Sequence, residues 1–504
     1  MNFFFNRIRQ KDKFNNLVVL SFATLMSLLV LISTWSNGIG ITPDTVNYFA
    51  ATDSFLGSGN FIGFNGQPMS LWPPLYPLLL ALLSVLGLSH PLAALVINIF
   101  SAFLIIYFFS KLLDLFQIQV RLKIFCLSWA VMSGVLLSML NTAWTEPLFI
   151  LLFIFFTYYL LKYLKEGDNK FFITIIIIAG MSALLRYLGV AMIIAGCVLI
   201  FYNFKELNFK KRLVKAMQFV FFSSLPLAIW MIRNLIVTDT LAGPRTFEKN
   251  TFTEQLVSFF NTISLWISWS FLYHVIRFIF LALVITMALY FYFKKKNQLN
   301  INTIFKNTGF IILIYIALII VLSTIGTGQL IDSRYLAPIY LFILALVFYL
   351  LNKKINFKNV WVITLVIMIT ASFVLQLSVS LYIDNKMGVQ ALSTGEWRSY
   401  IESTNIDNFN FIEDKKLVTN SPSGFYLDTG RYSDFSAIKG ESLEEFVNRT
   451  GDDFYLVWYF GTTLHPSLND FDWIYDKFES ELLQLNESTD SEVSSRIYHI
   501  SGLR

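Results

Sequence analysis

A polar loop at residues 37–77 carries the first side chains that could do chemistry. It holds two acids, Asp44 and Asp53, and no Lys or Arg, and it leads through Trp72-Pro73-Pro74 into an apolar run. A carboxylate can accept a proton from a reacting group. Because the loop follows one hydrophobic segment and returns at once to another, we expect a site where water meets a membrane.

Three other polar stretches supply ionisable groups from distant parts of the chain. They contain Glu146 within 141–147, Arg233 and Arg245 within 230–245, and Asp332, Arg334 and Tyr335 within 332–335. Arginine binds anions such as phosphate through charge-assisted hydrogen bonds. A further arginine, Arg186, separates two apolar runs, and we expect it to be buried against protein with a polar partner, because an unpaired arginine in lipid is costly.

The two acids nearest the membrane also have a structural interpretation. Thr42-Pro43-Asp44 supplies an N-cap, a proline at the first helical position and an acid near the positive end of the helix dipole. Glu146-Pro147 begins an apolar segment in the same way. Both acids could therefore serve only to start helices.

The other candidates have structural interpretations too. Arg233 and Arg334 could extend to lipid headgroups, and Asp332 is better explained as a surface partner of Arg334. The aromatic residues near the loops suit the belt at the membrane surface as well as contact with a substrate; these are Tyr48, Trp72 and Tyr335.

The composition defines the class of protein. The chain has 504 residues, of which 56% are hydrophobic and 14% charged, whereas soluble domains carry roughly 25% charged residues. It is therefore expected to be a polytopic, all-helical membrane protein. Cys126 and Cys197 both lie in apolar runs, so they indicate no disulfide framework.

Spanning helices need about 20 apolar residues, and eleven segments are candidates. They are 17–36, 91–113, 122–140, 147–164, 171–185, 187–204, 214–236, 269–293, 303–325, 335–352 and 358–383. We expect the first to be an uncleaved signal-anchor. The run 74–88 is shorter and begins with two prolines, which predicts a helix lying at the outer surface instead of a span.

The distribution of basic residues supports this topology. With the N-terminus inside, 22 of the 28 Lys and Arg residues before residue 384 lie in inner loops or at their edges, as the positive-inside rule requires. Counting 74–88 as a span would reverse every later segment. The basic excess needs no nucleic acid to explain it, because short loops account for it. We expect a multi-pass protein located in the plasma (inner) membrane.

The composition changes after residue 383. Residues 384–504 contain 21 acids and 10 Lys or Arg, which predicts an acidic domain outside the membrane, distinct from a membrane domain over 1–383. Strands are expected at 415–420, 423–430, 452–460 and 494–502, and helices at 393–403, 442–449 and 468–484. This alternation predicts a small α/β domain. It contains no glycine-rich phosphate loop and no cluster of metal ligands.

The order of these motifs resembles that of the GT-C membrane glycosyltransferases, which include protein O-mannosyltransferases and bacterial aminoarabinose transferases. The resemblance covers most of the chain. It rests on PDTVNYFAATDSFLGSG (43–59), WPPLYPLLLALL (72–83), WTEPLFILL (144–152), WMIRN (230–234) and DSRYLAPIY (332–340). No single motif is diagnostic, but their order on one topology is fairly specific.

The resemblance implies transfer of a sugar from a polyprenyl-phosphate carrier to a lipid, glycan or protein acceptor on the outer face. Asp44 matches the acid that the family uses as catalytic base. Many relatives carry paired acids there, whereas Thr45 follows Asp44 in this chain, so the sequence gives no support for a divalent metal or another cofactor.

The chemistry agrees with one carboxylate and several arginines. Phosphate leaves as a stable anion and needs no acid, unlike the leaving group of a glycosidase. Asp44 would be the base, with Glu146 orienting the acceptor or tuning Asp44. Arg334 and Arg233, with Arg186 or Arg245, would bind the leaving phosphate; Tyr48 and Tyr335 are further candidates for substrate contact.

Two other functions stay open. A transporter or lipid flippase of envelope polysaccharide synthesis would also be polytopic, although such proteins tend to carry ionisable groups near the middle of the membrane and repeated halves. A non-catalytic binding protein that works through residues 384–504 is the other alternative. Replacing Asp44 by Asn separates both from an enzyme.

Overall fold

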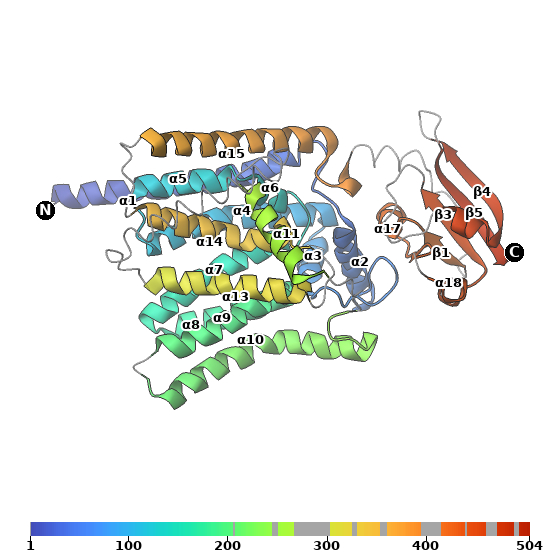
Figure 1. Ribbon diagram of the computed structural model, residues 1–504, viewed down its shortest axis with the longest axis horizontal. Coiled ribbons are helices and arrows are strands. Elements are labelled where there is room, and N and C mark those ends of the chain that lie inside the picture. Colours follow the sequence, from blue (N-terminus) through green and yellow to red (C-terminus); the bar gives the residue numbers. More distant parts are fainter. Residues whose placement is uncertain are drawn as a thin grey trace. The chain divides into compact units, whose positions relative to one another are not determined.

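A computed structural model describes residues 2–204, 207–243, 250–266, 303–324, 330–352, 360–394, 415–438, 441–459, 471–487 and 493–503. Two compact units make up the chain (Figure 1). The first comprises Met1–Trp35, Ser70–Leu75 and Ala94–Asn385, and the second comprises Ser36–Met69, Tyr76–Ala93 and Lys386–Arg504. Most of the polar loop after the first helix, up to Met69, is thus grouped with the C-terminal residues. The predicted boundary between a membrane domain (1–383) and a C-terminal domain (384–504) stays a prediction.

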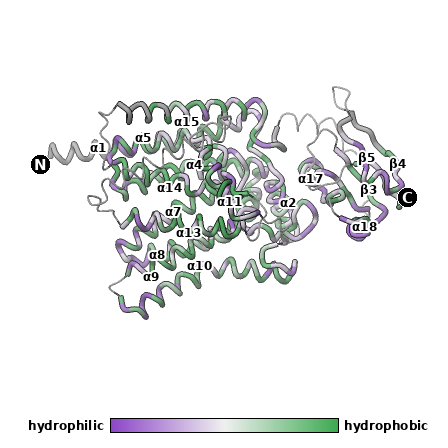
Figure 2. Tube along the Cα trace, viewed as in Figure 1, coloured by the Kyte–Doolittle hydropathy of each residue, from purple (hydrophilic) through white to green (hydrophobic). Residues whose placement is uncertain are grey.

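The first unit is helical. Its helices are α1 (Asn2–Ser33), α4 (His90–Leu115), α5 (Val120–Val131), α6 (Gly134–Leu140), α7 (Glu146–Glu166), α8 (Asn169–Leu185), η1 (Tyr187–Gly189), α9 (Val190–Asn203), α10 (Phe209–Thr238), α11 (Phe252–Leu265), α13 (Thr303–Leu322), α14 (Ser333–Asn352) and α15 (Val360–Met387). Apolar residues follow these helices along most of their length (Figure 2). The prediction of a helical membrane protein is confirmed.

The prediction of eleven spans stays a prediction. Among the described residues, six helices are long and apolar enough to cross a membrane, or seven if α5 and α6, bent by 54°, form one span. The predicted span 269–293 lies outside the described residues. Helix α3 (Leu75–Val85) has 11 residues, and at 1.5 Å per residue it covers about 16 Å, about half of the hydrocarbon core. The predicted short helix at 74–88 is therefore confirmed as a helix that does not span.

The break between α8 and α9 explains why Arg186 interrupts two apolar runs. Arg186 has extended backbone angles (φ −147°, ψ 138°), and one 3-10 turn, Tyr187–Gly189, leads into α9. A Cβ on Gly189 would lie 2.3 Å from the backbone carbon of Ser182. Only glycine allows this close approach of the chain to α8.

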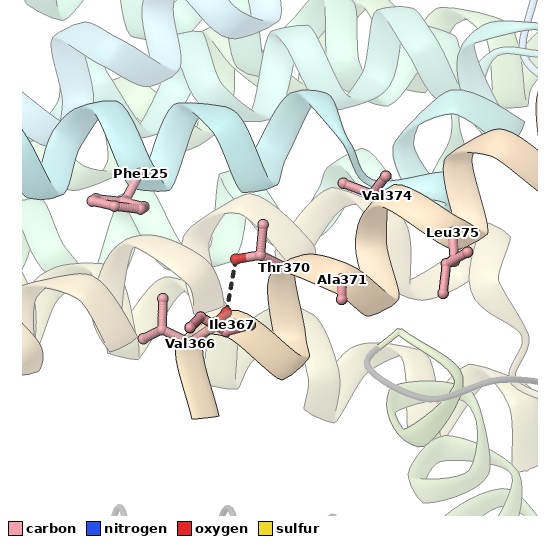
Figure 3. A pocket seen from close by; sticks show the side chains of 7 residues that line it. All are labelled: Phe125, Val366, Ile367, Thr370, Ala371, Val374 and Leu375. Atoms are coloured by element: carbon pink, nitrogen blue, oxygen red, sulfur yellow. Dashed lines mark hydrogen bonds between the residues drawn. The ribbon is translucent and has the colours of Figure 1, made fainter. Parts of the chain in front are cut away.

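A groove between α5 and α15 opens among apolar side chains. It has a volume of about 590 Å³ and is lined by Phe125, Val366, Ile367, Thr370, Ala371, Val374 and Leu375 (Figure 3). The hydroxyl of Thr370 donates to the carbonyl of Val366 and accepts from the indole nitrogen of Trp129 at 3.0 Å. The groove's one polar side chain is thus satisfied by protein, which leaves an apolar lining.

The second unit contains α2 (Pro43–Ser58), α3 and a five-stranded sheet. The strands are β1 (Lys416–Thr419), β2 (Asp434–Phe435), β3 (Phe454–Tyr459), β4 (Phe478–Glu487) and β5 (Val493–Leu503), in the order β2-β1-β3-β5-β4. Strands β2, β1 and β3 are parallel, whereas β5 is antiparallel to both β3 and β4. The remaining helices are η4 (Ala391–Ser393), α17 (Pro422–Thr429), α18 (Leu443–Thr450) and α19 (Phe471–Tyr475).

Two crossover helices cover the sheet's opposite faces. Phe425 of α17 packs with Tyr455, Val457 and Tyr459 of β3, whereas Phe446 of α18 packs with Phe454, Leu456 and Trp458. Because side chains alternate along a strand, these two sets point to opposite faces. The predicted α/β domain is confirmed.

Three predictions for single C-terminal elements have different outcomes. Residues 423–430 form helix α17 and not a strand, because Pro422 begins a helix and Gly430 ends it in a left-handed conformation. Residues 468–484 do not form one helix: α19 ends at Tyr475, and β4 pairs with β5 from Phe478 onwards. The expected helix at 393–403 lies almost wholly outside the described residues.

Candidate functional site

Glu146 is the centre of a charged cluster in the first unit. Thr145 is the N-cap of α7, and Pro147 follows at the start of the helix, as the sequence predicts. The side chain of Glu146 is 1% exposed. Burying a carboxylate away from water costs several kcal/mol unless other groups compensate it, so the partners of Glu146 decide what this cluster can do.

Two arginines from distant helices meet the same oxygen of Glu146. Arg186 Nη1 lies 2.5 Å from Oε1, and Arg334 Nε lies 2.8 Å from Oε1. The second oxygen, Oε2, accepts from the hydroxyl of Thr145 at 3.2 Å, and that hydroxyl oxygen accepts from Arg186 Nη1 at 3.0 Å. The polar partner expected for Arg186 is therefore Glu146.

The cluster brings one carboxylate to two guanidinium groups. Asp332 is a second acid close enough to interact electrostatically with Arg334 and Glu146. The side chains of Arg186 and Arg334 are 17% and 26% exposed, and the guanidinium carbon of Arg334 lies 4.0 Å from the centre of the Trp144 ring. Guanidinium groups are the side chains that bind phosphate and carboxylate anions most specifically. We call Trp144, Thr145, Glu146, Arg186 and Arg334 the Glu146 cluster.

Asp332 contributes to this arrangement by starting α14. Its Oδ1 accepts from the backbone nitrogens of Arg334 at 2.8 Å and Tyr335 at 3.3 Å, as a helix cap does. The guanidinium of Arg334 meanwhile bonds to Glu146. Asp332 therefore caps the helix in addition to its electrostatic interaction with Arg334. The carbonyl of Tyr335 accepts from the hydroxyl of Tyr315 at 2.9 Å.

Arg233 belongs to a neighbouring hydrogen-bond network. Its guanidinium lies 4.7 Å from the centre of the Trp230 ring and donates to Asn234 Oδ1. The amide nitrogen of Asn234 donates to the hydroxyl of Tyr187 at 3.3 Å, and that hydroxyl donates to the carbonyl of Ser70 at 2.7 Å. Because Tyr187 follows Arg186 directly, this network connects Arg233 to the break that positions Arg186. Arg245 lies outside the described residues.

Asp44 and Tyr48 lie on α2, in the second unit. Thr42 caps α2, Pro43 is its first residue, and Asp44 is in its first turn, so the helix start predicted from the sequence is confirmed. Asp44 is half-buried. Tyr48 is 1% exposed and packs edge-to-face on Tyr76, with ring centres 5.2 Å apart. This burial agrees with neither an aromatic belt at the membrane surface nor an open substrate contact for the Tyr48 ring.

A second cluster in the same unit was not expected. Asp53 Oδ1 lies 2.7 Å from His90 Nε2, and Asp53 Oδ2 accepts from the hydroxyl of Tyr426 at 2.9 Å. His90 Nδ1 is 2.9 Å from the hydroxyl of Ser84. A polar loop around Asp53 is evident from the sequence, but no sequence signal connects that loop with a tyrosine 373 residues away.

Within the parts of the chain that the structure describes, no group of three or more His, Cys, Asp or Glu side chains could hold a metal ion. The Glu146 cluster contains two guanidinium groups, a kind of donor that binds anions.

The chain combines a helical bundle with a small five-stranded sheet. No protein-family model and no curated protein sequence matches the chain. Among solved structures, it is similar to ArnT from Cupriavidus metallidurans in the apo state, with a TM-score of 0.61, 11% identity, and coverage of 95% of this chain and 97% of ArnT. The structure of the same ArnT bound to undecaprenyl phosphate gives a TM-score of 0.62 at the same identity and coverage.

Proposed function

We propose that this chain is a membrane glycosyltransferase that moves a sugar from a polyprenyl-phosphate carrier to an acceptor at the outer face of the plasma (inner) membrane. One observation supports it most: two arginines are fixed on the buried Glu146, in a chain with a fold similar to that of ArnT, whose structure has been solved with undecaprenyl phosphate.

In this proposal Asp44 is the general base. It takes the proton of an acceptor hydroxyl while the acceptor oxygen forms a bond to the anomeric carbon of the donor sugar. The bond from that carbon to the phosphate oxygen breaks, and its electron pair leaves with the polyprenyl phosphate. Direct attack inverts the anomeric carbon.

Arg334 and Arg186 stabilise the charge that develops on the leaving phosphate, with Arg233 as a further candidate. Fixed donors of this kind stabilise a transition state because they need no reorganisation during the reaction. Glu146 then has a different role from the one the sequence suggests. With its side chain 1% exposed and bonded to both arginines, it orients the guanidinium groups instead of the acceptor.

The apolar part of the carrier matches the membrane setting of the first unit. The acceptor is a lipid, a glycan or a protein, and the donor sugar is a pentose or hexose. We place residues 384–504 outside the cytoplasm. The basic residues of the preceding segment lie mainly in alternate short loops, which assigns those loops to the cytoplasmic side and the C-terminal residues to the other side.

Asp44→Asn tests the proposal directly. Cells that lack the gene are complemented with wild type, with D44N or with D168N, and their envelope glycolipids and glycoproteins are compared by mass spectrometry. Asp168 is the control because it makes the same acid-to-amide change at an exposed cap of α8. We expect one glycan-modified species with wild type and D168N, and its loss with D44N at equal protein level.

A binding measurement distinguishes the role of Asp44 as a base from the role of the arginines as an anion site. Undecaprenyl phosphate is titrated into the purified protein in nanodiscs, with Trp144 beside Arg334 and Trp230 beside Arg233 as fluorescent reporters. D44N should bind as wild type does, whereas Arg334→Gln should bind more weakly. If D44N restores the glycan species in full, Asp44 is not the base, and a transporter becomes the better explanation.

A further inference from the structure

Both oxygens of Asp53 are bound by side chains from other segments of the second unit. His90, the first residue of α4, reaches Oδ1, and Tyr426 of α17 reaches Oδ2. Ser84 of α3 bonds to the other nitrogen of His90. A neutral His90 that donates from Nε2 to Asp53 accepts at Nδ1 from the hydroxyl of Ser84. A protonated His90 donates from both nitrogens, so each of these hydrogen bonds can form in either state of the imidazole. Within the second unit, one carboxylate therefore joins α2 to His90, to Ser84 of α3 through His90, and to Tyr426 of α17.

Apolar packing surrounds this hydrogen-bond chain. Val46 and Ala50 of α2 are buried in one cluster with Leu392 and Tyr426. Val46 and Ala50 are four residues apart, so they lie on one face of the helix. That face also carries Asp53 one turn further on, and the helix is held along its length by residues after position 385.

The loop that follows α2 makes a second contact with the same domain. The carbonyl of Phe64 accepts from the backbone nitrogen of Ser433 at 3.4 Å, and the ring of Phe64 packs edge-on against Phe435, with centres 6.3 Å apart. Tyr432, one residue before Ser433, stacks on Tyr426 with ring centres 5.6 Å apart. The contact therefore extends from α17 to β2.

We infer that residues 415–503 are a docking domain for helix α2, and that Tyr426, acting through Asp53, is a positioning residue for Asp44. This inference rests on the proposed function, because it gives Asp44 its role. Asp53 and Asp44 lie nine residues apart on one helix, about 13 Å along its axis. A helix of this length moves as a rigid body, so a change in how α2 is held at Asp53 is carried to Asp44.

The opposite face of α2 has its own anchors. The hydroxyl of Thr52 donates to the carbonyl of Tyr48 and lies 3.3 Å from that of Pro77, while Tyr48 packs on Tyr76. With α3 on one side and α17 on the other, losing the Tyr426 hydroxyl should shift α2 without unfolding it. This makes Tyr426→Phe an informative variant, because it removes one oxygen and leaves the buried ring in place.

The matched control is Tyr432→Phe. Tyr432 is the stacking neighbour of Tyr426 and is 42% exposed, and within the described residues no hydrogen bond of its hydroxyl is found. Wild type, Y426F and Y432F are compared as full-length protein in nanodiscs. Hydrogen–deuterium exchange of 43–58 reports docking, and sugar transfer measured across a pH series reports the position of Asp44.

We expect Y426F to exchange faster over 43–58 and to lose roughly three- to tenfold in kcat, within the range for one typical hydrogen bond. We also expect the acid limb of its pH–rate profile to shift, because a displaced helix changes the surroundings of Asp44. A mere loss of folded protein would lower kcat without moving that midpoint. Y432F should match wild type in all three measurements.

The outcomes separate the two proposals. Wild type that transfers no sugar overturns the proposed function, while faster exchange in Y426F still supports docking. Active wild type with unchanged exchange in Y426F overturns the docking domain. Faster exchange with an unchanged kcat and pH midpoint overturns the positioning role of Tyr426.

Discussion

Glu146→Gln is the sharpest test of the charged cluster. The substitution keeps the shape and size of the side chain but removes the negative charge that two arginines share. Removing one member of a buried ion pair typically costs about 3–5 kcal/mol, because the remaining charge is left uncompensated. Here one substitution leaves two guanidinium groups facing each other, so we expect a loss in the upper part of that range.

The chain offers a matched control on the same helix. Glu166 lies at the other end of α7, is 43% exposed, and has Lys162 4.0 Å away. An exposed i,i+4 pair of this kind contributes about 0.3–0.5 kcal/mol, so Glu166→Gln should change stability very little. Comparing the two variants cancels effects of helix propensity, because both replace Glu by Gln in α7.

The ion cluster also predicts which single variant loses more stability. Arg334→Gln leaves Glu146 paired with Arg186, so it should cost less than Glu146→Gln, by about the 1.5–3 kcal/mol of one charge-assisted bond. Unfolding is followed by circular dichroism in mixed micelles with increasing dodecyl sulfate. Equal midpoints for Glu146→Gln and Glu166→Gln, or a larger loss for Arg334→Gln, would refute the ion cluster.

Two other predictions concern the backbone and pH. Gly189→Ala should lower the yield of folded protein sharply, because its Cβ would lie 2.3 Å from the backbone of Ser182, whereas Gly309→Ala, with no atom within 4 Å of its Cβ, should be neutral or slightly stabilising; size-exclusion profiles in detergent measure both. Burial raises the pKa of Asp53, but the hydrogen bond and charge of His90 and the hydroxyl of Tyr426 lower it further, so that it lies below the ordinary 3.8. A lowered pKa means that docking of α2 is stabilised above pH 3.8 and that this contribution is lost as the pH falls through the lower value; exchange of 43–58, corrected for its intrinsic pH dependence, should rise there, and exchange that stays flat across this range would contradict it.

The sequence predicts the membrane architecture well because hydropathy is a local property. Apolar runs and the charge of short loops are read one segment at a time, and most of the expected helices are present. It also predicts that Arg186 is buried with a partner, since lipid forbids a bare arginine. It could not identify Glu146 as that partner, because the pair depends on how α7 packs beside the break after α8.

The errors have the same origin. Asp332 and Arg334 are two residues apart and suggest a simple pair, but the aspartate also accepts from backbone nitrogens at a helix start, and the arginine also bonds to Glu146. Residues 478–487 are rich in Glu and Leu, which favours a helix, but pairing with β5 outweighs that preference. In each case a tertiary contact overrides a local tendency.

The energetics of the Glu146 cluster argue for function over stability. Replacing a buried ion cluster by apolar side chains of similar size is often neutral or stabilising, so a membrane helix bundle gains little by keeping one carboxylate and two arginines together. What the ions provide and apolar residues cannot is a pair of guanidinium groups held in fixed positions by one carboxylate. Since that arrangement is expensive to bury and guanidinium groups suit phosphate, we propose anion binding as the reason why these three residues meet.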